Sequence, residues 1–347
     1  MRRLLMLLFL SILLAGAAGL GGLWLYGRPG PLAGDQAIVI PHGGLASAGA
    51  ALQRHGALPD GPASLLGFRL AGRLTRDQGP VHAAELAFPA HASVRDLLLV
   101  LRTSRPVQHE LTVPEGLTAA QIAVLVAGAA ALAGPAPVPA EGSIMPDTYA
   151  YELAMPRREL VGRMQAAMRR RLAQVWAGRD AQPELPTPDD LLILASVVER
   201  ETAKAAERPL VARVFLNRLH QGMRLQSDPT VIYGASGGLG VLARPLSRAD
   251  LAQPNPYNSY LLPGLPPGPI CAPGLASLQA TAHPAAGDAL YFVADGTGGH
   301  AFAADLPTHL QNVARLRARE ASHATGVSAP APPVPIPTVP VPPVLAK

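Results

Sequence analysis

Two glutamates, Glu199 and Glu201, lie in an otherwise apolar stretch, LLILASVVERETA, at residues 191–203. Apolar residues run nearly all round its helical wheel, which predicts a buried helix over residues 188–204. Burying an unpaired carboxylate is costly, so each acid needs a partner or a chemical role. A carboxyl group in apolar surroundings also keeps its proton to higher pH, as general acid/base catalysis requires.

Only one of the two acids can face a given cleft, because residues two apart on a helix project roughly 160° from each other. Glu201 shares its face with bulky aliphatic residues, and Arg208 follows along that face. We therefore predict Glu201 as the partner of Arg208 in an ion pair and Glu199 as the general acid/base. From this helix alone, a buried salt bridge at Glu199 remains an alternative. The face of Glu199 carries small residues that leave room for a ligand: Ala195, Ser196 and Ala203.

Two polar clusters further along the chain are candidates for sugar binding. Sugars are recognised by hydrogen bonds to their hydroxyl groups and by an aromatic face against the ring. The first cluster flanks a strand-like segment, residues 230–233, although an ordinary Ser-Asp-Pro turn is the alternative. The second lies in a Pro-rich loop, where Asn258 is the preferred polar contact. The predicted substrate-binding residues are Gln226, Ser227, Asp228, Thr230, Tyr233, Tyr257, Asn258 and Tyr260.

Other catalytic patterns are weaker. The segment GASGG at residues 234–238 matches a serine nucleophile elbow around Ser236, but an elbow needs a helix directly after it. The glycines and Pro245 oppose that helix. His283 and His300 lack the partners of known metal motifs and are expected to be ordinary hydrogen-bonding residues. We therefore expect no metal and no cofactor.

The composition of the 347-residue chain, with a formal net charge of +5, limits its class and location. The positive charges are scattered arginines without the basic tract typical of nucleic-acid binding, so no nucleic-acid partner is expected. A single cysteine, Cys271, excludes an internal disulfide. Arg2 and Arg3 precede an uncharged stretch at residues 4–26, which predicts a membrane anchor, a cytoplasmic stub at 1–3 and a remainder outside the cytoplasm. A cleaved signal peptide ending near Ala17 is the alternative.

The predicted elements indicate an α+β protein with two modules. Residues 37–88 follow a strand, helix, helix, strand pattern, and a helix (94–102), a strand (108–113) and the start of another helix come next. An Ala, Gly and Pro-rich stretch at 127–140 is typical of a linker, so we place modules at 34–126 and 141–320. The second module is α-rich, with helices at 158–176, 188–204, 208–221 and 307–320 and a strand at 290–294. Residues 328–347 are predicted to form a disordered Pro-rich tail.

Four long motifs in order resemble those of the YceG-like (MltG) endolytic murein transglycosylases. Shorter matches extend the resemblance over most of residues 37–320, including a Gly299-His300 pair. The four motifs are LASVVERET (194–202), VFLNRL (214–219), GMRLQSDPTVIYG (222–234) and GLPPGPI (264–270).

The resemblance implies a single-pass anchor in the inner membrane, a LysM-like first module and an extracytoplasmic catalytic domain. It implies cleavage of nascent peptidoglycan strands between MurNAc and GlcNAc with 1,6-anhydro-MurNAc ends, and cell-wall synthesis proteins as candidate partners. The catalytic Glu of the family is matched to Glu199. Two rivals stay open: a hydrolytic muramidase using a second carboxylate such as Asp228, and a non-catalytic peptidoglycan-binding scaffold.

Overall fold

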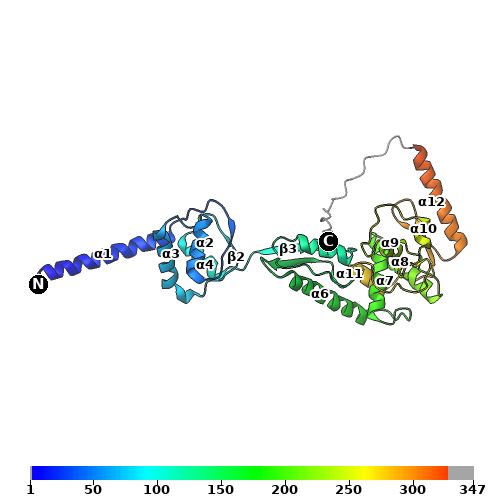
Figure 1. Cartoon of the computed structure of the whole chain (residues 1–347), viewed down its shortest axis with the longest axis horizontal. Coiled ribbons are helices and arrows are strands. Elements are labelled where there is room, and N and C mark those ends of the chain that lie inside the picture. Colours follow the sequence, from blue (N-terminus) through cyan, green and yellow to red (C-terminus); the bar gives the residue numbers. More distant parts are fainter. Residues whose placement is uncertain (1, 327–347) are drawn as a thin grey trace, which may run out of the picture. The chain divides into compact units, whose positions relative to one another are not determined.

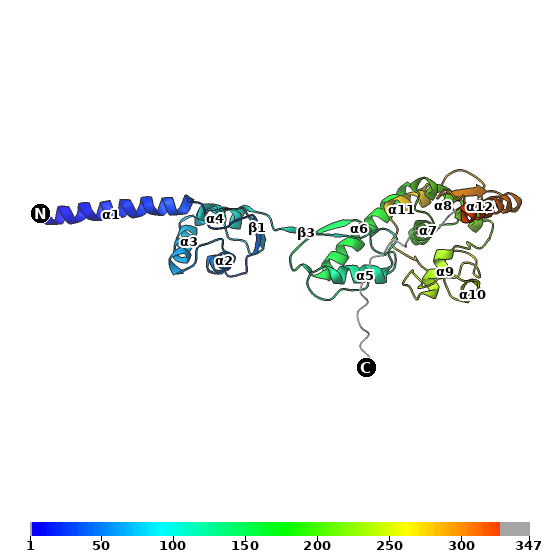
Figure 2. The same ribbon diagram turned by 90° about the horizontal axis from the view of Figure 1, so that it is seen from above.

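The computed structural model describes residues 2–326, and the chain divides into two compact units, Met1–Met168 and Arg169–Lys347. The fold is mixed α and β and mostly helical, with six short strands in three separate two-stranded sheets among the described residues (Figures 1 and 2). The predicted tail at 328–347 lies outside those residues.

The chain begins with one long apolar helix, α1 (Arg2–Gly27). Its segment Leu5–Gly27 is long and apolar enough to cross a membrane. By length and composition this helix fits either a single-pass anchor or a signal sequence.

The first folded part of unit 1 has the predicted strand, helix, helix, strand order. Strands β1 (Gln36–Val39) and β2 (Glu85–Phe88) pair antiparallel, with Gln36 opposite Phe88. Between them lie α2 (Gly44–Arg54), α3 (Pro62–Leu74) and the 3-10 helix η1 (Arg76–Gln78), and α4 (Val94–Thr103) follows. The inward faces of these elements form one apolar core, whose largest fully buried members include Ile38, Leu52, Phe68, Phe88 and Leu98.

The rest of unit 1 is built across the stretch predicted as a linker. Strand β3 (Gln108–Thr112) pairs antiparallel with β4 (Thr148–Glu152), and α5 (Ala119–Gly128) lies between them in sequence. Arg157, at the start of α6 (Arg157–Gly178), donates hydrogen bonds to the carbonyls of Val126, Ala127, Ala129 and Gly134. These contacts hold the Ala, Gly and Pro-rich stretch within unit 1, and the boundary with unit 2 falls inside α6.

Unit 2 is a helical cluster with one small sheet. Its sheet pairs β5 (Tyr291–Ala294) with β6 (His300–Ala303) antiparallel. The helices are α7 (Pro188–Glu201), η2 (Ala205–Glu207), α8 (Arg208–His220), α9 (Asp228–Ala235), α10 (Arg248–Ala252), α11 (Leu275–Ala282) and α12 (Leu306–Gly326).

Helix α7 is the central element of unit 2. Thr187 and Asp190 form a capping box at its start, with Pro188 in the first turn. Helices α8, α9 and α11 all pack against it, which explains why apolar residues lie on nearly all of its sides. The helix ends at Glu201, earlier than predicted, because Thr202 is extended and its hydroxyl accepts a hydrogen bond from the Lys204 amide.

Candidate active site

Glu201 is the last residue of α7 and lies where that helix meets the start of α9. The Ser227 hydroxyl donates a 2.9 Å hydrogen bond to Glu201 Oε2. Burial raises the pKa of Glu201 to about 7, although the Ser227 hydrogen bond acts in the opposite direction. The Asp228 charge raises this pKa further, whereas His300 and Arg218 lower it. A carboxyl group with this pKa can both give and take a proton near neutral pH.

Ser227 is directed at Glu201 by an unusual local backbone. Gln226 has a left-handed φ of 52°, which non-glycine residues rarely adopt. Ser227 occupies the N-cap position of α9, yet its hydroxyl makes no capping bond and contacts Glu201 instead. Strained backbone of this kind is often found at functional sites. Both residues are predicted to bind substrate. Gln226 is exposed to solvent, whereas Ser227 is buried.

The loop at residues 257–260 is fastened to the same turn. Ser259 Oγ accepts a hydrogen bond from the Ser227 amide and lies 2.7 Å from Thr230 Oγ1. The Tyr260 hydroxyl donates a 2.6 Å hydrogen bond to Asp228 Oδ1. Burial, followed by this hydrogen bond, raises the pKa of Tyr260 above its usual value. The structure thus brings Ser227, Asp228, Thr230 and Tyr260 together around Glu201.

Other predicted residues serve the loop itself. The buried Asn258 amide donates hydrogen bonds to the carbonyls of Leu251 and Gln253, and its oxygen accepts one from the Tyr260 amide. The preferred polar contact of the sequence prediction is therefore engaged within its own loop. Tyr233 and Tyr257 pack edge to face, with ring centroids 4.7 Å apart.

Two charged groups near Glu201 are not among the predicted site residues. Arg218 is buried, and its guanidinium donates to the carbonyls of Leu290 and Leu225 at 2.7 and 2.6 Å. Burial lowers the pKa of Arg218, and the Glu201 charge opposes that shift. Arg218 lies inside the VFLNRL motif, and that motif is the sequence signal that could have identified Arg218 as a site residue.

The second group is a hydrogen-bonded pair, Glu207 and His300. His300 Nδ1 lies 2.7 Å from Glu207 Oε2, and Thr202, next to Glu201, donates to the same oxygen at 3.2 Å. Burial acts to raise the pKa of Glu207, but hydrogen bonds from His300 lower it below its usual value. His300 is therefore a satisfied hydrogen-bonding residue, as predicted. A Cβ at Gly299 would stand 2.6 Å from Glu207 Oε1, so a larger residue there would require the Glu207 carboxylate to shift.

Glu199 has a different environment from the one predicted. Its Oε1 lies 3.4 Å from Arg208 Nη2, and its Oε2 accepts a 2.9 Å hydrogen bond from the Gly274 amide. The predicted pairing of Arg208 with Glu201 is wrong: Arg208 pairs with Glu199, whose side chain is only 6% exposed.

Two of the three small residues beside Glu199 do not leave room for a ligand, whereas Ala203 is exposed. Ala195 and Ser196 are fully buried. The Ser196 hydroxyl accepts a hydrogen bond from the Ile270 amide, and the Ser196 carbonyl accepts one from Cys271 Sγ. The space that these small side chains leave is filled by the chain before α11.

The serine-elbow pattern also has the wrong surroundings. Residues 230–233, predicted to be strand-like, belong to helix α9 because Asp228 and Pro229 begin a helix there. Ser236 follows that helix, donates to the Tyr233 carbonyl and accepts from the Gly240 amide. Within residues 2–326, no cluster of three or more His, Cys, Asp or Glu side chains could hold a metal ion.

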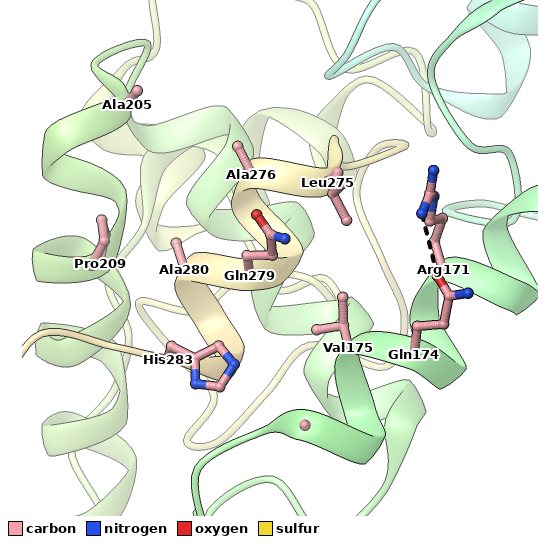
Figure 3. A pocket seen from close by; sticks show the side chains of 11 residues that line it. Arg171, Gln174, Val175, Ala205, Pro209, Leu275, Ala276, Gln279, Ala280 and His283 are labelled. Atoms are coloured by element: carbon pink, nitrogen blue, oxygen red, sulfur yellow. Dashed lines mark hydrogen bonds between the residues drawn. The ribbon is translucent and has the colours of Figure 1, made fainter.

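A hollow of about 580 Å³ opens elsewhere on unit 2, between the end of α6 and α11 (Figure 3). Its polar lining consists of Arg171, Gln174, Gln279 and His283, over a floor that includes Val175 and Leu275. No carboxylate lines this hollow, so it lacks the carboxyl acid that the sequence analysis predicts. The Glu201 cluster is the stronger candidate active site.

A family model and several known proteins are similar to this chain. The YceG-like family matches residues 38–315 of the chain. An endolytic murein transglycosylase from Streptococcus pneumoniae is 37% identical over 178 residues, which are 50% of this chain and 32% of that protein. One from Bacillus subtilis is 35% identical over 172 residues, 49% of this chain and 46% of that protein. The chain therefore spans less than half the length of each of these relatives. A YceG-like protein from Listeria monocytogenes, known from a crystal structure, aligns with a TM-score of 0.48 and 24% identity over 80% of this chain and 98% of that one.

Proposed function

Because the chain belongs to the YceG-like family, we propose that it is an endolytic lytic transglycosylase of peptidoglycan, with Glu201 as its general acid/base. The observation that carries this proposal is the buried Glu201 carboxyl, whose pKa is about 7 and which adjoins Ser227, Asp228 and Tyr260. Relatives named endolytic murein transglycosylases support the substrate class.

One carboxyl group suffices for this reaction. Protonated Glu201 gives its proton to the glycosidic oxygen as the bond between MurNAc C1 and that oxygen breaks. The resulting carboxylate takes the proton of the MurNAc C6 hydroxyl while that oxygen bonds to C1. The proton count at Glu201 is restored, no water is consumed, and the product is a 1,6-anhydro ring.

Glu201 is preferred over Glu199 for a physical reason. Arg208 and the Gly274 amide contact the two carboxylate oxygens of Glu199, whose side chain is only 6% exposed. A general acid must reach the glycosidic oxygen of its substrate. The role of Glu199 is then to tie α7 to α8 and to the chain before α11.

The second candidate is a hydrolytic muramidase. It is favoured by Asp228, whose charge acts on Glu201 and which is exposed. Paired carboxylates on either side of a glycosidic bond are usual in hydrolysis. In our proposal Asp228 has another part, because its charge helps Glu201 to keep its proton and its oxygen holds Tyr260.

The remaining parts of the proposal concern location and domains. We propose that α1 is a single-pass anchor of the inner membrane and that the folded units lie on the extracytoplasmic side, as Arg2 and Arg3 favour. We further propose that residues 34–126 include a LysM-like glycan-binding module and that residues 141–320 form the catalytic domain.

Incubating the full chain with purified, uncrosslinked glycan strands tests the proposal. A transglycosylase releases fragments of many lengths that end in 1,6-anhydro-MurNAc. A muramidase releases reducing MurNAc ends, and a binding scaffold leaves the strands intact. Either of the last two outcomes contradicts the proposed reaction.

A further inference from the structure

Helix α3 presents a row of exposed leucines to its surroundings. Leu66, Leu70 and Leu74 are 67%, 55% and 75% exposed, although each is a large apolar side chain. They are spaced by four residues, so they share one face of the helix. The opposite face carries Phe68 into the core. Helix α3 therefore has two apolar faces, and the outer one is not covered by the folded chain.

Part of this outer face, at Leu70 and Leu74, adjoins the end of α1. A hollow of about 680 Å³ is lined by Gly22, Leu23 and Tyr26 of α1 and by Gly67, Leu70 and Leu74 of α3 (Figures 1 and 2 show both helices). Its apolar walls are open to an acyl chain or to another apolar group.

The C-terminal turns of α1, which adjoin α3, are the turns where the helix would leave the bilayer. About 20 residues of helix cross the hydrocarbon core, so a span beginning at Leu5 ends near Trp24. Trp24 and Tyr26 are residue types that favour the boundary between hydrocarbon and head groups. Leu70 and Leu74 therefore lie beside the outermost turns of the span, the level at which interfacial helices bury their apolar faces by about 5–10 Å.

The charges of α3 fit a lipid surface as well. The helix carries Arg69 and Arg73 and no acidic residue, and Arg76 follows it. Arginines flanking an apolar face attract anionic head groups and can extend toward water.

We propose that α3 is a membrane-surface helix, with Leu66, Leu70 and Leu74 inserted among the lipids of the leaflet from which α1 emerges. This inference rests on the proposed anchor role of α1. It means that two points of attachment hold the first module against the bilayer, so the module does not swing freely on the anchor.

Spin labels on the full chain, reconstituted in vesicles of phosphatidylethanolamine and phosphatidylglycerol, test the inference. Labels are placed by Leu70→Cys, by Leu20→Cys within α1, and by the control Val39→Cys, which is 47% exposed on β1 and does not line the hollow. The native Cys271 is fully buried and stays unlabelled. Collisions with oxygen, which partitions into lipid, are compared with collisions with a water-soluble nickel chelate.

We expect the oxygen-to-nickel collision ratio to be severalfold higher at positions 70 and 20 than at Val39. If position 20 is in lipid while position 70 matches Val39, the inference is overturned and the anchor stands. If positions 20 and 70 both match Val39, the anchor and the inference fail together. A label at position 70 shielded from both reagents indicates a protein contact, such as a second copy, and overturns the inference too.

Discussion

Ser227 occupies the N-cap position of α9, but its hydroxyl donates to Glu201 on α7 at 2.9 Å instead of capping its own helix. A capping bond usually contributes about 1 kcal/mol to helix stability. Ser227 forgoes that bond and contacts Glu201. Here the hydroxyl orients the carboxyl group and moderates the pKa that burial raises. The site thus consists of a buried acid, a hydroxyl that favours its charged form and a carboxylate, Asp228, that disfavours it.

The assignment of the acid predicts opposite results for the two glutamates of α7. Glu201→Gln should fold normally and lower turnover of glycan strands by at least ~10²-fold, the scale for losing a general acid/base. Glu199→Gln is the matched control, because it changes the same residue type on the same helix. A folded Glu199→Gln variant should retain most activity. A folded but inactive Glu199→Gln variant beside an active Glu201→Gln variant would reverse the assignment.

The raised pKa of Glu201 predicts that stability depends on pH. An unfolded Glu titrates near 4.5, whereas Glu201 in the fold has a pKa of about 7. Its contribution to stability is therefore fully present below pH 4.5 and is lost as the pH rises through 7. Glu201→Gln removes that loss, so at pH 8 it should be more stable than the native chain by on the order of 3 kcal/mol.

Urea unfolding at pH 5 and pH 8 measures this difference, which should be much smaller at pH 5. Glu199→Gln should instead destabilise the chain by about 2 kcal/mol, because it removes the carboxylate that contacts Arg208 and accepts from the Gly274 amide. Equal effects of the two substitutions at pH 8 would contradict the separate roles.

We expect Ser227→Ala to shift the pH profile of activity toward higher pH. Removing the hydroxyl removes a hydrogen bond that lowers the pKa of Glu201, so that pKa rises. Because catalysis begins with protonated Glu201, the alkaline fall in rate should move to higher pH. Helix α9 should remain intact, since Ser227 makes no side-chain capping bond. An unchanged alkaline limb in a folded variant would separate Ser227 from the acid.

We expect Asp228→Asn to shift the pH profile of activity toward lower pH. Removing the Asp228 charge removes an influence that raises the pKa of Glu201, so the alkaline fall should move to lower pH. The Tyr260 hydroxyl can still donate to the Asn oxygen, which keeps the loop in place. Rates on glycan strands between pH 5 and pH 9 measure the shift, and a move to higher pH would refute this electrostatic role.

The sequence predicts the elements of this site better than their contacts. The apolar run around Glu199 indicates a buried helix, and its period separates the two acids onto different sides, as observed. It does not tell which element covers which side. Ala195 and Ser196 signal either space for a ligand or close approach of the chain, and only the packing of Ile270 against Ser196 decides between them.

The same limit applies to residues 226–233. A run of Thr, Val, Ile and Tyr is typical of a strand, but the Asp228-Pro229 start places it in a helix. Local propensity is a weak guide where a helix packs against α7, because tertiary contacts override it. The contact between Ser227 and Glu201 joins two motifs that the family resemblance identifies separately, and no periodicity within either motif predicts it.

The sharpest prediction concerns the atoms of the product. Intramolecular attack by the C6 hydroxyl needs no positioned water, because this nucleophile is already tethered to the reacting ring. Digestion in ¹⁸O-labelled water should therefore give MurNAc ends that carry no label and lack the mass of water, with Glu201→Gln as the inactive control. Hydrolysis assisted by Asp228 would add one labelled oxygen at each cut and leave reducing ends. Mass spectrometry of the released fragments separates the two reactions, and labelled reducing ends that disappear in Asp228→Asn would establish the muramidase in place of the transglycosylase.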